Sequence, residues 1–113
     1  MTCDQRIEYQ SDDATTADDL AATNNVPSAA LLHLNSMMMY SVGSGSYCAP
    51  LACEATIVGG EDPTSANNFV DHHGNITLTQ FWAWNTYMDP KNLRPEEVVC
   101  IGHVCSAAIV KQY

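Results

Sequence analysis

Hydrophobic and polar positions follow the same order twice along the chain, about fifty residues apart. Each copy predicts a short strand, a polar turn, two short helices, a loop and a closing strand. In the first copy the strands are predicted at residues 7–10 and 46–51 and the helices at residues 17–22 and 28–34. In the second copy the strands are predicted at residues 55–58 and 97–101 and the helices at residues 65–71 and 77–85. The pattern therefore indicates two tandem copies of one small unit.

The two copies align residue by residue over most of their length. Val26–Asn35 matches Ile76–Asn85 without a gap, and Tyr9–Leu20 matches Val58–Phe69. Two cysteines recur with the same spacing in each copy, namely Cys48 and Cys53 in the first and Cys100 and Cys105 in the second. The segment Leu51–Glu54 between the copies is too short to act as a flexible linker. We therefore expect the two units to be fixed relative to each other.

Helix signals are clearest in the second copy. Thr77-x-x-Gln80 is typical of a capping box at the start of a helix, and Gly74 is expected to end the helix before it. Phe81 and Trp84 lie three residues apart, so both side chains are expected to face the sheet. These two aromatic residues are therefore predicted to form the core of the second unit.

The segment from residue 75 to residue 102 carries a more specific signal. It reads N-I-T-L-T-Q-F-W-A-W-N-T-Y-M-D-P-K-N-L-R-P-E-E-V-V-C-I-G. An apolar helix ends in Trp84-Asn85, a short loop follows, and Asn92-Leu93-x-Pro95 leads into a strand. This segment resembles the second half of a LysM domain, the small glycan-binding module, in its fungal secreted form. The resemblance covers residues 7–105 and is most specific in the second half of the second copy.

The resemblance implies an α+β fold of two tandem βααβ LysM modules, a degenerate one at residues 1–51 and a second at residues 52–113. Each module is then a two-stranded antiparallel sheet backed by two helices. Two loops depart from the family pattern. The usual Ser-Gly-Asp-Thr turn is replaced by Ser11-Asp12-Asp13-Ala14-Thr15 and by Gly60-Glu61-Asp62-Pro63-Thr64. The usual Asn-Pro after the second helix is replaced by Asn35-Ser36 and Asn85-Thr86.

Charge and cysteine content narrow the class of partner. The formal net charge is −9, and an acidic surface repels nucleic acid and anionic lipid but tolerates neutral sugars. No apolar run is long enough to predict a membrane span. Five cysteines in a small chain favour a secreted protein, found outside the cell or in a cell wall. Because Met1–Gln5 does not look like a signal peptide, we expect a mature secreted chain with an added start methionine.

The resemblance places a glycan site in each module, between the turn after the first strand and the loop after the second helix. In the first module the candidate residues are Asp12, Asp13, Ala14, Thr15, Ser36, Met37 and Met38, with Met39 beside them. In the second module they are Glu61, Asp62, Pro63, Thr64, Thr86, Tyr87, Met88 and Asp89. Loop backbone groups can bond the acetamido group of N-acetylglucosamine, and the apolar side chains can cover its methyl group or ring face. Chitin or its oligomers are therefore the expected partner.

Several of these residues also have a simpler structural explanation. Met37–Met39 can fill space under the loop without touching a ligand. Asp13 and Asp62 can cap a turn or a helix. The whole chain could also be a protein-interaction or structural unit that kept the LysM fold and lost glycan affinity, or a binder of peptidoglycan.

Catalytic and metal-binding interpretations are weaker. Glu61 and Asp62 are adjacent in one turn, whereas the acids of a glycosidase flank the bond that is cleaved. His72 and His73 are adjacent and therefore point apart, and no Cys-x2-Cys accompanies them. We expect no enzymatic activity, no cofactor and no metal. Asn75-Ile76-Thr77 is a glycosylation sequon, which supports secretion only weakly.

The five cysteines allow two disulfides and one free thiol. Given the antiparallel strands of the implied fold, Cys3–Cys48 and Cys53–Cys100 treat the two copies alike. The rival pairs Cys53 with Cys105 or with Cys3, and sequence alone does not decide between them. On the first assignment Cys105 is free and could link two chains, and a shared glycan could also join them into a dimer.

Overall fold

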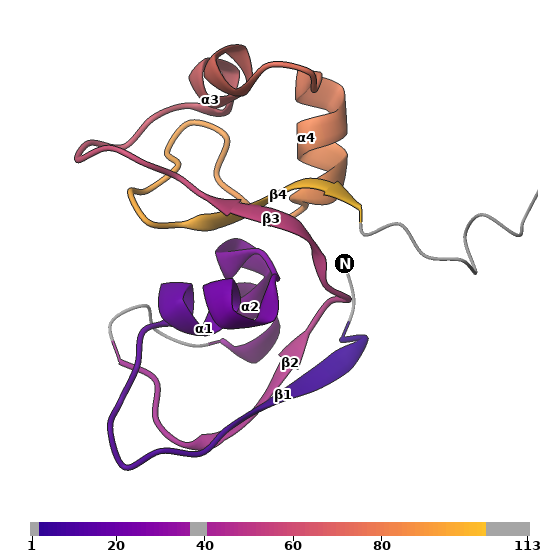
Figure 1. Cartoon of the computed structure of the whole chain (residues 1–113). Coiled ribbons are helices and arrows are strands. Elements are labelled where there is room, and N and C mark those ends of the chain that lie inside the picture. The colour runs from indigo at the N-terminus through magenta and orange to yellow at the C-terminus, as the bar shows by residue number, and fades with distance from the viewer. Residues whose placement is uncertain (1–2, 37–40, 104–113) are drawn as a thin grey trace, which may run out of the picture.

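The computed structural model describes residues 3–36 and 41–103, and within them one βααβ order occurs twice (Figure 1). The first unit contains β1 (Gln5–Tyr9), α1 (Ala17–Asn24), α2 (Ser28–Asn35) and β2 (Gly45–Ala49). The second contains β3 (Cys53–Ile57), α3 (Ala66–His73), α4 (Leu78–Trp84) and β4 (Val98–His103). The predicted α+β class, the element order and the pair of two-stranded antiparallel sheets are confirmed.

Side-chain caps fix where the helices begin. The Thr16 side chain before α1 accepts a hydrogen bond from the Asp19 N–H at 3.0 Å. In the same way the Ser65 side chain before α3 accepts from the Asn68 N–H. The predicted capping box is confirmed, because Thr77 accepts from the Gln80 N–H at 3.1 Å while the Gln80 side chain accepts from the Thr77 N–H at 2.9 Å. These bonds satisfy amides that the helices themselves leave unpaired.

Each sheet is locked by a disulfide at one end. Gln5 pairs with Ala49 across the first sheet, and Cys53 pairs with His103 across the second. The bridges are Cys3–Cys48 and Cys53–Cys100, so the predicted pairing is confirmed. Cys105 lies outside the described residues. β1 and β3 both begin two residues earlier than predicted. Cross-strand pairing extends each strand to residues that the hydrophobic pattern leaves out.

One asparagine in each unit holds the end of the second helix against the closing strand. Asn85 donates to the carbonyls of Phe81, at 2.9 Å, and Cys100, at 2.8 Å, and its Oδ1 accepts from the Cys100 N–H at 2.7 Å. Asn35 makes the same three bonds in the first unit. This repeated bracket explains why both copies end their second helix in asparagine.

The elements stack in layers. Figure 1 shows α1 and α2 lying between the two sheets, while α3 and α4 cover the other side of β3 and β4. Neighbouring residues of β4 accordingly enter different cores: Val98 packs with Ile7, Leu20 and Leu31 of the first unit, and Val99 packs with the second core. The second sheet is therefore covered on both faces.

This layering has a sequence counterpart. The strand positions on the face of the second sheet toward the first unit are apolar: Ala55 and Val98 pack in the first core, and Ile57 is 54% exposed. The equivalent positions of the first sheet are polar and exposed: Arg6, Glu8 and Ser46. No helix of the described residues lies outside the first sheet, and these side chains on its outer face are exposed.

Polar contacts also join the two units. The Val98 N–H donates to the buried Ser28 hydroxyl at 2.8 Å, and the guanidinium of Arg94 donates to both carboxylate oxygens of Asp18 at 3.0 and 3.3 Å. These contacts agree with the expectation that the short connection fixes the units relative to each other. No helix among residues 3–36 and 41–103 is long and apolar enough to cross a membrane.

Candidate functional site

In each unit the turn after the first strand is hydrogen-bonded to the later part of the loop that follows the second helix. In the first unit Thr15 and Val42 exchange two backbone hydrogen bonds of 2.9 and 2.7 Å, and in the second unit Thr64 and Leu93 do the same at 2.9 and 2.7 Å. In the second unit the Ala66 N–H also donates to the Pro90 carbonyl at 2.8 Å. The turn after the first strand therefore contacts residues 90–93 directly rather than the Thr86–Asp89 segment.

In the first unit the turn is exposed. Asp12, Asp13 and Ala14 are open to solvent and Thr15 is half-buried. The Ser11 hydroxyl accepts from the Asp13 N–H at 3.1 Å, so a serine helps to hold the turn. Ser36 follows α2 in the left-handed conformation, with φ of 47°. Met37 and Met38, together with Met39, lie outside the described residues.

In the second unit the polar candidates lie on the surface. Glu61, Asp62 and Pro63 are exposed, and so are Thr86 and Asp89. The Asp89 carboxylate accepts from the Lys91 N–H at 3.0 Å, which shapes the loop after α4. The two apolar candidates between Thr86 and Asp89 are less exposed, with Tyr87 half-buried and Met88 buried.

Met88 and Tyr87 point to different places. Met88 is only 8% exposed and belongs to the second core, where one edge of it forms part of a pocket of about 310 Å³. The Tyr87 ring instead stacks on the His33 ring of α2, with centroids 3.9 Å apart and 15° between the planes. The structure thus assigns Met88 to a surface pocket of the second unit and Tyr87 to the junction between the units.

Trp82 is the residue that the sequence analysis missed. Its side chain is 51% exposed and borders the Met88 pocket. It also borders a second pocket of about 330 Å³ at the start of α3, and Pro90 lies in both. We call the combined feature the Trp82 groove. It is lined by Ser65, Ala66, Asn67, Leu78, Trp82, Asn85, Thr86, Met88, Pro90 and Lys91.

Helical geometry explains the omission. Phe81 is fully buried, as expected, but Trp84 is only half-buried and lines a pocket with Pro50 and Leu51 at the connection between the units. The prediction that Trp84 is a core residue like Phe81 is therefore wrong. Successive helical residues are about 100° apart, so three aromatic residues at positions 81, 82 and 84 do not fit on one face. The spacing of these three residues in the sequence could therefore have predicted that one of the aromatic side chains is exposed.

The junction between the units contains a buried acid. Glu97 is 3% exposed, and its carboxylate accepts from the Arg94 N–H at 3.1 Å. Burial raises the pKa of Glu97 above its ordinary value of 4.5, while the hydrogen bond and the charge of Arg94 act in the opposite direction. Arg94 also reaches Asp18, so this cluster ties α1 to the segment before β4. Its contacts are those of a structural junction.

The chemistry of the Trp82 groove is that of a binding surface for a neutral ligand. Its lining combines an indole face, a thioether and neutral hydroxyl and amide groups, and Lys91 is the one charged residue among them. Among residues 3–36 and 41–103 no three His, Cys, Asp or Glu side chains cluster as metal ligands. Comparison of the chain with models of known protein families gives no match, and comparison with curated proteins gives none either.

Proposed function

We propose that this chain is a non-enzymatic carbohydrate-binding protein of the LysM type that recognises N-acetylglucosamine polymers, chitin or its oligomers, through its second unit. The observation that carries the proposal is the aromatic Trp82 groove in a βααβ unit, whose lining is neutral apart from Lys91. The groove ends in the loop after the second helix, where the resemblance to LysM domains also puts the ligand. Two disulfides in so small a chain support a secreted protein.

The groove offers the groups that an N-acetylated sugar requires. The exposed face of Trp82 can stack on the apolar face of a pyranose ring, and the edge of Met88 can contact the acetamido methyl group. Ser65, Asn67 and Thr86 supply hydroxyl and amide groups for the sugar hydroxyls. A neutral polymer also avoids the repulsion that a chain of net charge −9 exerts on anionic ligands.

The second unit is favoured over the first by a single aligned position. Trp82 matches Leu32 in the gapless alignment of the second helices, and Leu32 is half-buried against the first core. In the first unit, that position of the second helix therefore carries no aromatic platform. We propose one principal glycan site for each chain.

The test is the substitution Trp82→Ala, with binding of chitin oligomers measured by titration calorimetry. Loss of a stacking face should weaken binding by about tenfold or more, which corresponds to about 1.4 kcal/mol. Ile57→Ala is the matched control, because it also removes an exposed apolar side chain but lies outside the groove. Unchanged affinity in Trp82→Ala would refute the assignment of the site.

Retention on insoluble polysaccharides tests the ligand class. Wild-type protein should bind chitin more strongly than chitosan, cellulose or peptidoglycan. Binding to none of the four would favour the alternative of a protein-interaction unit that lost its glycan affinity. Retention on peptidoglycan alone would instead identify a peptidoglycan binder.

A further inference from the structure

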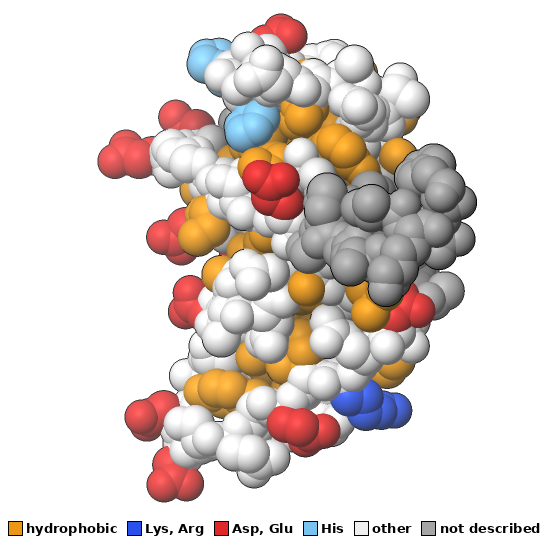
Figure 2. Space-filling model, turned by 45° about the vertical axis from the view of Figure 1, so that its right-hand side comes forward, with side chains coloured by type: hydrophobic (Ala, Val, Ile, Leu, Met, Phe, Trp, Pro, Cys, Tyr) orange, Lys and Arg blue, Asp and Glu red, His pale blue; other side chains and the backbone are white. Residues whose placement is uncertain are grey.

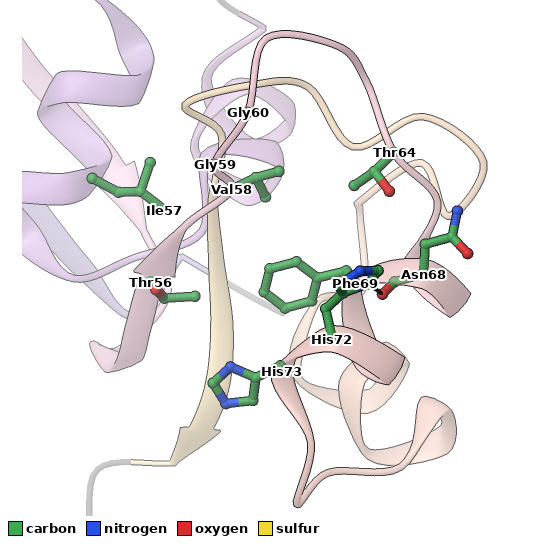
Figure 3. A pocket seen from close by; sticks show the side chains of 10 residues that line it. All are labelled: Thr56, Ile57, Val58, Gly59, Gly60, Thr64, Asn68, Phe69, His72 and His73. Atoms are coloured by element: carbon green, nitrogen blue, oxygen red, sulfur yellow. Dashed lines mark hydrogen bonds between the residues drawn. The ribbon is translucent and has the colours of Figure 1, made fainter.

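A second groove, with other residues of α3 in its lining than the Trp82 groove has, lies between that helix and the edge of β3 (Figure 3). Its volume is about 550 Å³. Phe69 and His73 come from the helix, and Val58, Gly59 and Gly60 come from the segment that follows the strand. We call it the β3 edge groove. It shares no lining residue with the Trp82 groove, although Thr64, a glycan-site candidate of the sequence analysis, lines it.

The backbone of β3 presents hydrogen-bonding groups to this groove. The Val58 N–H donates to the Glu97 carbonyl, and the Val58 carbonyl accepts from the Glu96 N–H, both at 2.8 Å, so Val58 pairs toward β4. Backbone groups alternate in direction along an extended strand, so those of Ile57 and Gly59 point to the open edge. The first unit occupies part of both outer edges, because the Ser28 hydroxyl accepts from the Val98 N–H of β4 at 2.8 Å and the Asn25 carbonyl accepts from the Cys53 N–H of β3 at 2.9 Å. The part of the β3 edge suited to pairing with another strand is therefore its C-terminal end, at Ile57 and Gly59.

An apolar recess lies beside this edge. The half-buried Phe69 ring is stacked between Phe81, with centroids 5.0 Å apart, and His73, at 5.9 Å. Figure 3 shows Val58 directed toward this recess while Ile57 points to the other side of the strand. In the first unit the position of Val58 is occupied by the larger Tyr9, whose hydroxyl donates to the Asp13 carbonyl at 2.7 Å. The second unit thus carries a smaller side chain at this position than the first, without a bond from it across the turn.

The charges around the groove indicate what kind of segment fits. The residues that line it include no Asp, Glu, Lys or Arg. Carboxylates follow directly in sequence at its rim, with Glu61 after Gly60 and Asp71 before His72, and both are exposed. On the face drawn in Figure 2, acidic side chains lie at the top, at the left edge and near the centre of the upper unit, close to its histidine and hydrophobic side chains. An apolar side chain flanked by cations is the complementary pattern.

We propose that the β3 edge groove binds an extended peptide segment of a partner protein, which adds a strand to β3 and places an apolar side chain beside the stacked rings of Phe69 and His73, with basic residues on either side. Strand addition supplies main-chain hydrogen bonds, and the recess supplies selectivity for the inserted side chain. This interaction is independent of the proposed glycan site.

The probe is a capped peptide with phenylalanine at its centre, a valine on each side and two lysines at each end. Amide hydrogen exchange of the full chain, followed by NMR, should slow at Ile57 and Gly59 by about tenfold or more when the peptide is added. N-methylation of the peptide amides that face β3 should abolish this protection, and replacing lysine by glutamate should weaken binding by about tenfold. Unchanged exchange at both amides, or protection only elsewhere, would overturn the proposal.

Substitutions at one position test the contact from the protein side. Ile57→Pro removes the outward N–H and is compatible with an edge strand, whereas Ile57→Ala keeps that N–H and removes the same side chain. The proline variant should bind the peptide about three- to tenfold more weakly, while the alanine variant should bind it like the wild type. If Ile57→Pro does not fold, the N-methylated peptides decide the matter alone. Chitin oligomers that protect these amides when the peptide does not would assign the groove to glycan and refute the peptide assignment.

Discussion

At the scale of single residues, Asn35 and Asn85, which hold the second helix of each unit against its closing strand, make the same bonds in different surroundings. Asn85 is 3% exposed, whereas Asn35 is only half-buried. Asn85→Ala leaves the Cys100 amide and two carbonyls without partners in a dry site, so it should cost about 3 kcal/mol of unfolding free energy. Asn35→Ala should cost about 1 kcal/mol, because water can replace the lost bonds.

Urea unfolding at neutral pH measures both asparagine variants under the same conditions. The two disulfides must be intact, which mass spectrometry of the folded proteins verifies. If both variants lose the same unfolding free energy, burial does not determine how much these asparagine hydrogen bonds contribute to stability.

Glu97 predicts a pH dependence of stability. Its folded pKa is raised by burial above the ordinary value of 4.5, so the folded state binds this proton more tightly than the unfolded state. The stability that Glu97 contributes is then fully present below pH 4.5 and is lost as the pH rises through the folded pKa. Glu97→Gln stays neutral and keeps an acceptor for the Arg94 N–H, so the variant should gain stability relative to wild type as the pH rises.

Unfolding of wild type and Glu97→Gln in urea at a series of pH values from 3.5 to about 7 tests this, because the difference between the two curves isolates one group. A difference that stays constant across the series, or one that changes in favour of wild type, would contradict the raised pKa.

At the scale of elements, neighbouring residues of α4 have different roles, one in the core and one in the proposed glycan site. Phe81 is fully buried, and Phe81→Ala should cost about 3–5 kcal/mol. Trp82 is half exposed, so Trp82→Ala should cost less than about 1 kcal/mol while affecting the proposed glycan site. Thermal unfolding of the two variants gives the comparison. A large loss of stability in Trp82→Ala would show that Trp82 belongs to the core.

Element boundaries were predictable where a local side-chain bond creates them. Thr77 and Gln80 form their capping box within a few residues of sequence, so no tertiary information was needed. The burial of Trp84 was not predictable in the same way, because its surroundings include Pro50 and Leu51 from the connection between the units. The same holds for Tyr87, whose partner His33 comes from the other unit. Local patterns locate a helix face, but not which distant segment covers it.

At the scale of the whole molecule, the internal repeat predicted the two βααβ units and their disulfides but not how the units stack. The relevant signal was a difference between the copies. Ser46 and Val98 occupy equivalent strand positions, yet one is exposed and polar and the other is buried in the core of the other unit. Apolar residues at positions where the partner copy is polar indicate a covered face. The covered face of the second sheet is found only when the two copies are compared one sheet face at a time, and not when they are compared one helix or strand at a time.

The stacking predicts that one substitution acts in opposite directions in two forms of the protein. In the full chain, Val98→Ser replaces a side chain buried against the first unit and should cost about 2 kcal/mol of unfolding free energy. A chain of residues 52–113 alone exposes the same face, where Val98 adds to an apolar patch that favours self-association. There, Val98→Ser should reduce dye binding to exposed apolar surface and lower the apparent mass in sedimentation. If the full chain loses stability but dye binding and the apparent mass of the fragment do not fall, Val98 stabilises the second unit itself. The units would then not depend on each other as the layered fold requires.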